Sequence, residues 1–170
     1  MKYKIFTYPV PPPETPEDLN GFLSSRRVVS VQSHIVVKNQ IPYLIFIVEY
    51  IEITPEESVL WRKYKISAIS ARHTETTKPQ ALKIETDSKT LAYTGDGELT
   101  EALIDFSAEA DLLIAECYYF DKPIKWHLNY PDIKNLKPKK IVLTHMHENM
   151  LAHKDEIPET CAYDGLEIKI

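Results

Sequence analysis

Three residues that can bind a metal ion follow separate short segments of the chain. Asp96 stands in Tyr-Thr-Gly-Asp-Gly after 91–94, His145 directly follows the apolar run 140–144, and His73 follows 68–72. Zinc, manganese and iron accept imidazole nitrogen together with carboxylate oxygen. Each residue alone has a structural alternative, Asp96 as a turn residue and the histidines as surface residues. A divalent-metal site therefore depends on the fold bringing the three together.

The elements expected around these residues alternate between strands and a helix. Alternation and short apolar runs predict strands at 68–72, 81–86, 90–94, 111–116 and 140–144, and a helix at 99–108 with one apolar face. Open α/β sheets place ligands at the carboxyl ends of their strands, which is where the three candidates stand. The sequence therefore predicts an α/β fold with a site at one edge of the sheet.

The front of the chain has a different pattern. The expected elements are a strand at 2–8, a helix at 16–25, strands at 28–38 and 43–53, and a helix at 54–65 that begins with Thr-Pro-Glu-Glu. Residues 1–66 carry 8 basic and 7 acidic side chains, whereas residues 67–170 carry 12 and 18. We therefore expect two domains, a small α+β segment at 1–66 and a second segment at 67–170.

The stretch from about residue 69 to residue 170 resembles the C-terminal half of metallo-β-lactamase-fold hydrolases, in the branch of ribonuclease Z and cyclic phosphodiesterases. The matching strings are Arg72-His73, Leu91-Ala-Tyr-Thr-Gly-Asp96, Ala110-Asp-Leu-Leu-Ile-Ala-Glu-Cys-Tyr118, Ile141-Val-Leu-Thr-His145 and Asp164-Gly165. The resemblance implies a β-α-β-β-α front segment followed by half of a metallo-β-lactamase αββα sandwich.

The resemblance also implies roles for five residues. His73 would bind one metal ion, Asp96 would bridge two ions, and His145 would bind the second. Glu116 and His127 would orient or relay a proton to the leaving group. The implied reaction is hydrolysis of a phosphodiester or related ester by a metal-bound hydroxide, with zinc as the first candidate metal and manganese or iron as alternatives.

The chain departs from this family in one respect. The family's His-x-His-x-Asp-His motif does not occur in the sequence, whose histidines are 34, 73, 127, 145, 147 and 153. We therefore expect weak or single-metal binding, and impaired or no hydrolysis by the isolated chain. The substrate of an active form would be a small-molecule or nucleotide phosphodiester. A complementing chain that supplies ligands, or a homodimer that covers the exposed face of the half-sandwich, are the expected partners.

Residues 1 to about 62 resemble the small N-terminal domain of bacterial HRDC-type accessory proteins. The strings that carry this resemblance are Met1–Thr7, Leu19–Gln32 and Phe46–Tyr50, none of which contains a catalytic motif. The alternative function is therefore a non-catalytic binding or interaction module, attached to a second segment with relict ligands.

Composition excludes several other classes of protein. The chain has 170 residues, 44% of them hydrophobic, which is enough for a packed core, and no apolar run long enough to cross a membrane. A net charge of −5 argues against a dedicated nucleic-acid binder. Two separated cysteines and no signal peptide-like start favour a reducing, cytoplasmic location.

Overall fold

The computed structural model describes residues 2–10, 17–25 and 27–170, and the chain divides into two compact units. The amino-terminal unit is Met1–Glu52 and the carboxy-terminal unit is Ile53–Ile170. The boundary lies before the one expected at 66/67 because residues 58–66 pair into the sheet of the carboxy-terminal unit. In the described part of the chain no helix has the length and apolarity needed to cross a membrane.

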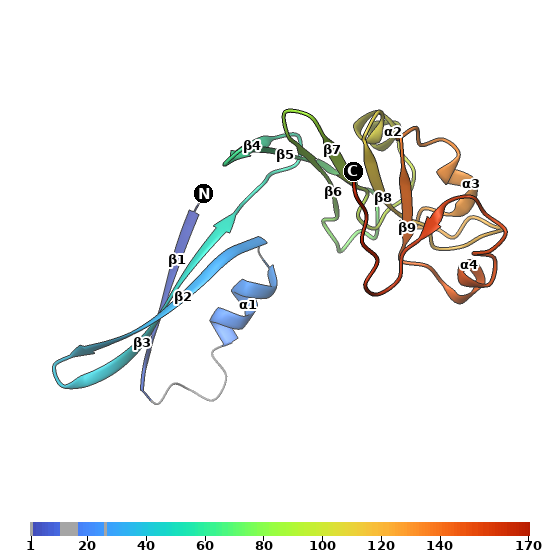
Figure 1. Cartoon of the computed structure of the whole chain (residues 1–170). Coiled ribbons are helices and arrows are strands. Elements are labelled where there is room, and N and C mark those ends of the chain that lie inside the picture. The colour runs from blue at the N-terminus through green and yellow to red at the C-terminus, as the bar shows by residue number, and fades with distance from the viewer. Residues whose placement is uncertain (1, 11–16, 26) are drawn as a thin grey trace. The chain divides into compact units, whose positions relative to one another are not determined.

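The amino-terminal unit is a three-stranded antiparallel sheet with one helix on it (Figure 1). The elements are β1 (Lys2–Pro9), α1 (Glu17–Ser25), β2 (Arg27–Lys38) and β3 (Ile41–Ile51), and the strand order is β1-β3-β2. The first four predicted elements are therefore present in the predicted order. The predicted helix start at Pro16 lies outside the described residues.

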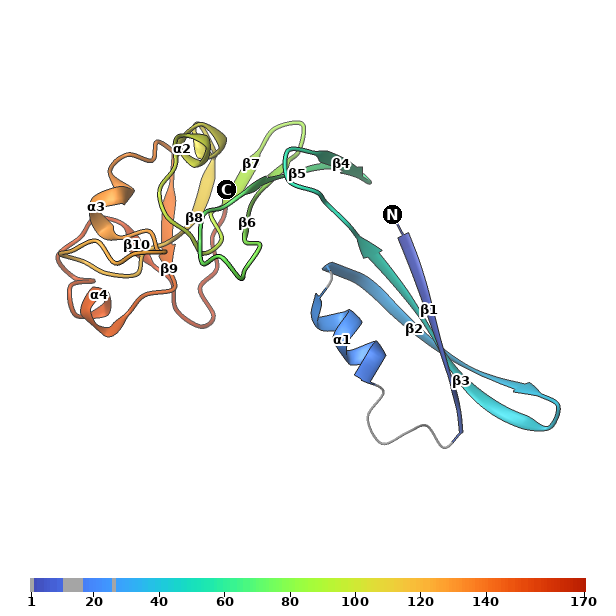
Figure 2. The ribbon, with the colours of Figure 1, turned by 180° about the vertical axis from the view of Figure 1, so that it is seen from behind.

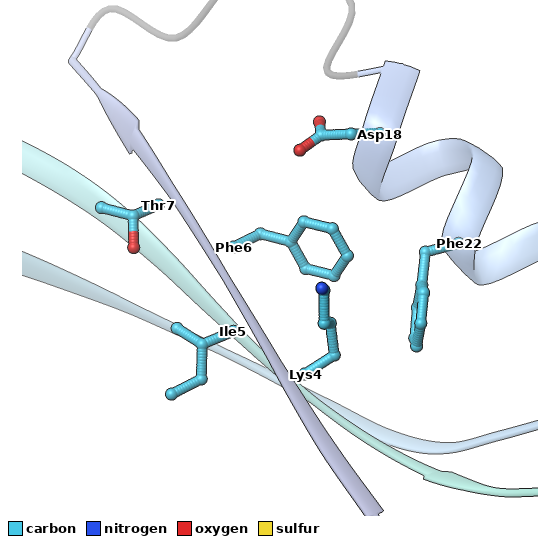
Figure 3. Close-up of a pocket in the computed structure, with 6 residues that line it drawn as sticks. All are labelled: Lys4, Ile5, Phe6, Thr7, Asp18 and Phe22. Carbon is cyan, nitrogen blue, oxygen red and sulfur yellow. The ribbon is translucent and has the colours of Figure 1, made fainter.

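Alternation along β1 decides which side chains α1 covers. Phe6 and Tyr8 point to the helix and are buried with Leu19 and Val48. The hydroxyl of Tyr8 donates to Oδ1 of Asp18 at 2.5 Å, which ties β1 to the first turn of α1. Figure 3 shows the resulting division of side chains along the strand: Lys4 and Phe6 lie on the side of Asp18 and Phe22, whereas Ile5 and Thr7 lie on the other side.

The carboxy-terminal unit contains one seven-stranded mixed sheet in the order β10-β9-β8-β7-β6-β5-β4 (Figure 2). Strands β4 to β7 are antiparallel, and β7 to β10 are parallel. The strands are β4 (Ser58–Trp61), β5 (Tyr64–Ser70), β6 (Gln80–Glu85), β7 (Thr90–Tyr93), β8 (Leu112–Glu116), β9 (Ile141–Thr144) and β10 (Thr160–Cys161). The helices are α2 (Glu101–Ser107), α3 (Tyr130–Ile133) and α4 (Glu148–Ala152).

The main core of this unit lies between the helices and one face of the parallel strands. Leu113 on β8, Leu143 on β9 and Met150 on α4 are each fully buried in a single cluster. Helix α2 begins at its N-cap Thr100, whose side chain accepts the backbone N–H of Leu103. This alternation of strands and helices confirms the α/β class predicted from the sequence.

The predicted helix at 54–65 is wrong, because residues 58–65 belong to the β4–β5 hairpin and residues 54–57 form a turn before it. Trp61 pairs with Tyr64 and Leu60 pairs with Lys65 across a two-residue turn, in which Arg62 has φ 55°. The Thr-Pro-Glu-Glu string has the composition of a helix start, but the pairing of β5 with β6 and the β-forming residues of 58–70 outweigh that local preference.

Candidate metal centre

The strand directions bring the predicted residues to one edge of the sheet. Asp96, Glu116 and His145 lie at the carboxyl ends of β7, β8 and β9, which are parallel neighbours. Strand β5 is antiparallel to β6, which is antiparallel to β7, so β5 runs in the same direction as β7. His73, which follows β5, therefore belongs to the same edge.

Two glycines hold the segment that carries Asp96 close to its neighbours. Gly95 has φ 64°, and a Cβ atom there would lie 2.6 Å from the carbonyl oxygen of Gln80. A Cβ atom on Gly97 would lie 3.1 Å from the carbonyl oxygen of Arg72. Only glycine fits the first position without moving the backbone of β6, so the position of Asp96 depends on it.

Glu116 is a completely buried carboxylate that organises the centre of the site. Its Oε2 atom accepts the backbone N–H groups of Gly97, at 2.9 Å, and Leu128, at 3.2 Å. Its Oε1 atom accepts a hydrogen bond from Nδ1 of His127. These three donors satisfy the carboxylate inside the protein, and they leave Nε2 as the nitrogen of His127 that can exchange a proton or bind an ion.

His145 connects the two carboxylates of the site. Its Nδ1 atom lies 2.9 Å from Oδ1 of Asp96 and 3.9 Å from Oε1 of Glu116. Among the residues that the structure describes, Glu116, His127 and His145 form the one group of three potential ligands whose donor atoms all lie within 4.8 Å of one another. Asp96 extends this group through its contact with His145.

His73 lies beside the group but is engaged differently. Its Nδ1 atom donates to the carbonyl oxygen of Trp126 at 2.5 Å, which leaves Nε2 as the unprotonated nitrogen of the neutral ring. Its ring centroid is 5.2 Å from that of His127. His73 and Asp96 also line the same surface pocket. The structure thus joins Asp96 to His145 and Glu116 to His127, and it places His73 against His127.

The sequence reasoning missed two residues that support the histidines. Tyr118 stacks on His127, with ring centroids 4.2 Å apart and an interplanar angle of 16°. Glu98 pairs with Arg72 at 3.3 Å and accepts the backbone N–H of Trp126 at 3.0 Å. The residues that Glu98 contacts, Arg72 and Trp126, directly precede His73 and His127 in the sequence. This adjacency is the only sequence signal for the role of Glu98.

Burial and acidic groups determine the direction of the pKa shift of Tyr93, the last residue of β7. Burial raises the pKa of Tyr93, and the negative charges of Asp96 and Glu116 raise it further. Burial also raises the pKa of Cys117, which follows Glu116, to about 12. The Cys117 side chain is completely buried in the core cluster with Met150, and it is not part of the group of potential ligands formed by Glu116, His127 and His145.

The donor set fits a divalent ion of the zinc type. Imidazole nitrogens from His127 and His145 and carboxylate oxygens from Asp96 and Glu116 are the ligand atoms that such ions accept in proteins. The hydrogen bonds on Nδ1 of His73 and His127 orient those rings in the way that outer groups orient metal ligands.

No protein-family model matches the chain, and no curated protein matches its sequence. Several solved structures do match its fold. The metallo-β-lactamase fold protein YhfI from Bacillus subtilis is 24% identical over 66% of this chain and 51% of its own length, with a TM-score of 0.54. A diphosphatase of the PhnP family is 20% identical over 69% of this chain and 47% of its own, with a TM-score of 0.55. Human tRNase Z, short form, is 19% identical over 66% and 45%, with a TM-score of 0.52.

These similarities show the fold. About two thirds of the chain has the metallo-β-lactamase fold, which confirms the resemblance predicted from the strings at 69–170. The chain spans about half the length of the solved structures that it matches.

Proposed function

We propose that the carboxy-terminal unit binds a divalent metal ion, zinc in the first place, and is a metal-dependent hydrolase of phosphodiesters or related esters. One observation carries the proposal: Asp96, Glu116 and His145 lie at the carboxyl ends of parallel strands, and the loop residue His127 meets them there. The PhnP-family diphosphatase and human tRNase Z among the matching structures support a phosphoester substrate.

The roles of the residues follow from their contacts. Asp96, His145 and His73 are the proposed ligands. A bound divalent ion would acidify a water molecule and stabilise negative charge on the ester. Glu116 holds the Nδ1 proton of His127, so Nε2 is the atom that would give a proton to the leaving oxygen.

We further propose that this chain holds an incomplete ligand set. The support is that it spans about half the length of the matching structures and lacks the His-x-His-x-Asp-His string. A complementing polypeptide would then supply the missing ligands, and the isolated chain would bind no more than one metal ion and hydrolyse esters slowly.

Metal-dependent thermal unfolding tests the proposal directly. A chelator-treated chain should melt at a higher temperature when zinc or manganese is added, because an ion at about 100 times its Kd stabilises the folded state by about 2.7 kcal/mol. Asp96→Asn should remove most of this shift. The control is Asp87→Asn, in the exposed turn before β7, which should keep it. Elemental analysis should find at most one zinc ion per chain.

The alternative function, a non-catalytic interaction module, predicts a different result. Its support is the amino-terminal unit, which has no catalytic motif in its sequence. If both metals leave the melting temperature of the wild-type chain unchanged, the metal proposal is wrong and the module is favoured. Two tightly bound zinc ions would instead contradict the incomplete ligand set.

A further inference from the structure

The β2 strand of the amino-terminal unit is a long edge strand. Its pairing with β3 is irregular between Val28 and Ser30, but residues 31–38, beyond that irregularity, lack the usual protection. It lies at the end of the order β1-β3-β2, and between Arg27 and Lys38 it contains no proline and no lysine, arginine, aspartate or glutamate. Residues 31–38 are exposed on both faces, with Ile35 at 70% and Val37 at 67%. Charged residues, prolines and short lengths normally keep such edges from pairing with another chain.

The hydrogen-bond pattern shows which backbone groups of β2 point outward. The N–H of Val10 donates to the oxygen of Pro42, which lies opposite it, so even-numbered residues of β3 bond to β1 and odd-numbered ones bond to β2. The two-residue turn at Asn39–Gln40 has φ values of 51° and 65°, and it is closed by the pair Lys38–Ile41. Such a pair is hydrogen-bonded, so this turn also indicates that odd-numbered residues of β3 bond to β2.

The outward-pointing residues of β2 are therefore the odd-numbered ones. Residues 32, 34, 36 and 38 bond to β3, while the N–H and C=O groups of Val31, Ser33, Ile35 and Val37 face the open edge. Four successive residues of this kind can form a ladder with a second strand.

We propose that this edge pairs with the same edge of a second copy of the chain, as an antiparallel β2–β2 ladder with its two-fold axis at His34. In this register Val31 pairs with the partner's Val37, and Ser33 pairs with the partner's Ile35. All four outward residues of each copy then form main-chain hydrogen bonds, and the two sheets become one sheet of six strands. The inference goes beyond the proposed hydrolase function and does not depend on the metal site.

Charge complementarity favours a second copy over an unrelated peptide. In this register Lys38 lies opposite the partner's Ser30. In each copy Ser30 Oγ donates to the carboxylate of Glu49 at 3.0 Å, and Glu49 also accepts from the hydroxyl of Tyr3 at 3.3 Å. The small serine allows the Lys38 ammonium to reach over it to the partner's Glu49. The two-fold axis produces this ion pair twice, as a symmetric interface requires.

The other edge of the sheet is less suited to pairing. Because even-numbered residues of β1 bond to β3, the backbone N–H and C=O groups of Tyr3, Ile5 and Thr7 face the open edge of β1. Pro9, the next residue in this series, has no N–H to extend a ladder. Strand β1 is also shorter, with 8 residues against 12 in β2. The geometry therefore selects β2.

Two matched proline variants of the full chain test the interface. Ile35→Pro removes an outward N–H of β2, and Ile5→Pro removes an outward N–H of β1, so neither breaks a bond inside the sheet. Ile35 and Ile5 are similarly exposed, at 70% and 61%. Sedimentation over about three orders of magnitude in concentration should show dimers of the wild-type chain and of Ile5→Pro, and monomers of Ile35→Pro.

A charge exchange tests the register without a proline. Lys38→Glu should raise the dimer Kd by about tenfold or more, and Lys38→Glu with Glu49→Lys should bring it back to within about threefold of the wild-type value. These variants decide the question if Ile35→Pro does not fold. A monomeric wild-type chain, a dimer that survives Ile35→Pro, or dissociation by Ile5→Pro alone would each overturn the proposal.

Discussion

Replacing Glu116 by glutamine removes the charge at the centre of the site and almost nothing else. The wild-type carboxylate accepts three hydrogen bonds, from the N–H groups of Gly97 and Leu128 and from Nδ1 of His127. A glutamine amide can accept through its oxygen only, so one side of the group presents an NH2 to a former donor. His127 must then change its tautomer to accept from the amide.

The size of the effect follows from these three bonds. A hydrogen bond to a charged group contributes about 1.5–3 kcal/mol and a neutral one about 0.5–1.5 kcal/mol, so the difference is about 1 kcal/mol for each bond. Glu116→Gln should therefore lower the free energy of unfolding by about 3 kcal/mol. For a unit of this size the melting temperature of the carboxy-terminal unit would fall by about 12 °C.

The assay is thermal and urea unfolding of the metal-free full chain at neutral pH. Glu75→Gln, at an exposed position two residues after His73, is the control and should change stability by less than about 0.5 kcal/mol. Removing a buried charge also removes the cost of burying it. A Glu116→Gln variant as stable as the wild-type chain would show that this cost equals the contribution of the hydrogen bonds, and would refute the reasoning.

Two further perturbations test the framework around the site. Gly95→Ala should destabilise the carboxy-terminal unit by about 2 kcal/mol or more in urea unfolding, because the left-handed backbone and the carbonyl of Gln80 both oppose a Cβ atom. The control is Gly21→Ala in α1, where a Cβ atom would enter open space. This variant should stabilise the chain by about 0.5–1 kcal/mol. Equal effects would contradict the close approach. Burial, and a hydrogen bond to Glu159, raise the pKa of Tyr130 from 10.0 to about 12, so the folded state favours the neutral phenol. Its contribution to stability is complete below pH 10 and is lost as the pH rises towards 12, and Tyr130→Phe should show a smaller fall in unfolding free energy over that window.

The sequence predicted the carboxy-terminal strands well because each is a short apolar run bounded by turn residues. The runs 111–116 and 140–144 became β8 (Leu112–Glu116) and β9 (Ile141–Thr144), and the helix at 99–108 became α2 (Glu101–Ser107). The error at 54–65 has a different cause. A capping pattern reports local preference only, and the partner that makes β5 a strand, β6, lies 10 residues or more further along the chain.

The sequence could predict only those residues of the site that stand at the carboxyl ends of strands. Residues at the carboxyl ends of β7, β8 and β9 must share an edge, so the proximity of Asp96, Glu116 and His145 follows from the sequence pattern. His127 lies in a loop, and its position depends on the bond to Glu116 and on the Tyr118 ring, which no periodicity reveals. The contact of His73 with the oxygen of Trp126 joins positions 53 residues apart and is equally hidden.

Glu98 is bonded to both of the loops that carry His73 and His127. Its carboxylate binds Arg72 beside His73 and the N–H of Trp126 beside His127, and its own N–H donates to the oxygen of Arg72 at 2.7 Å. Neither loop can swing away from the sheet edge without breaking a bond to the same residue. Opening of either loop therefore breaks a bond to Glu98 and the bond between His73 and the oxygen of Trp126, so the two opening free energies share contributions and are not independent.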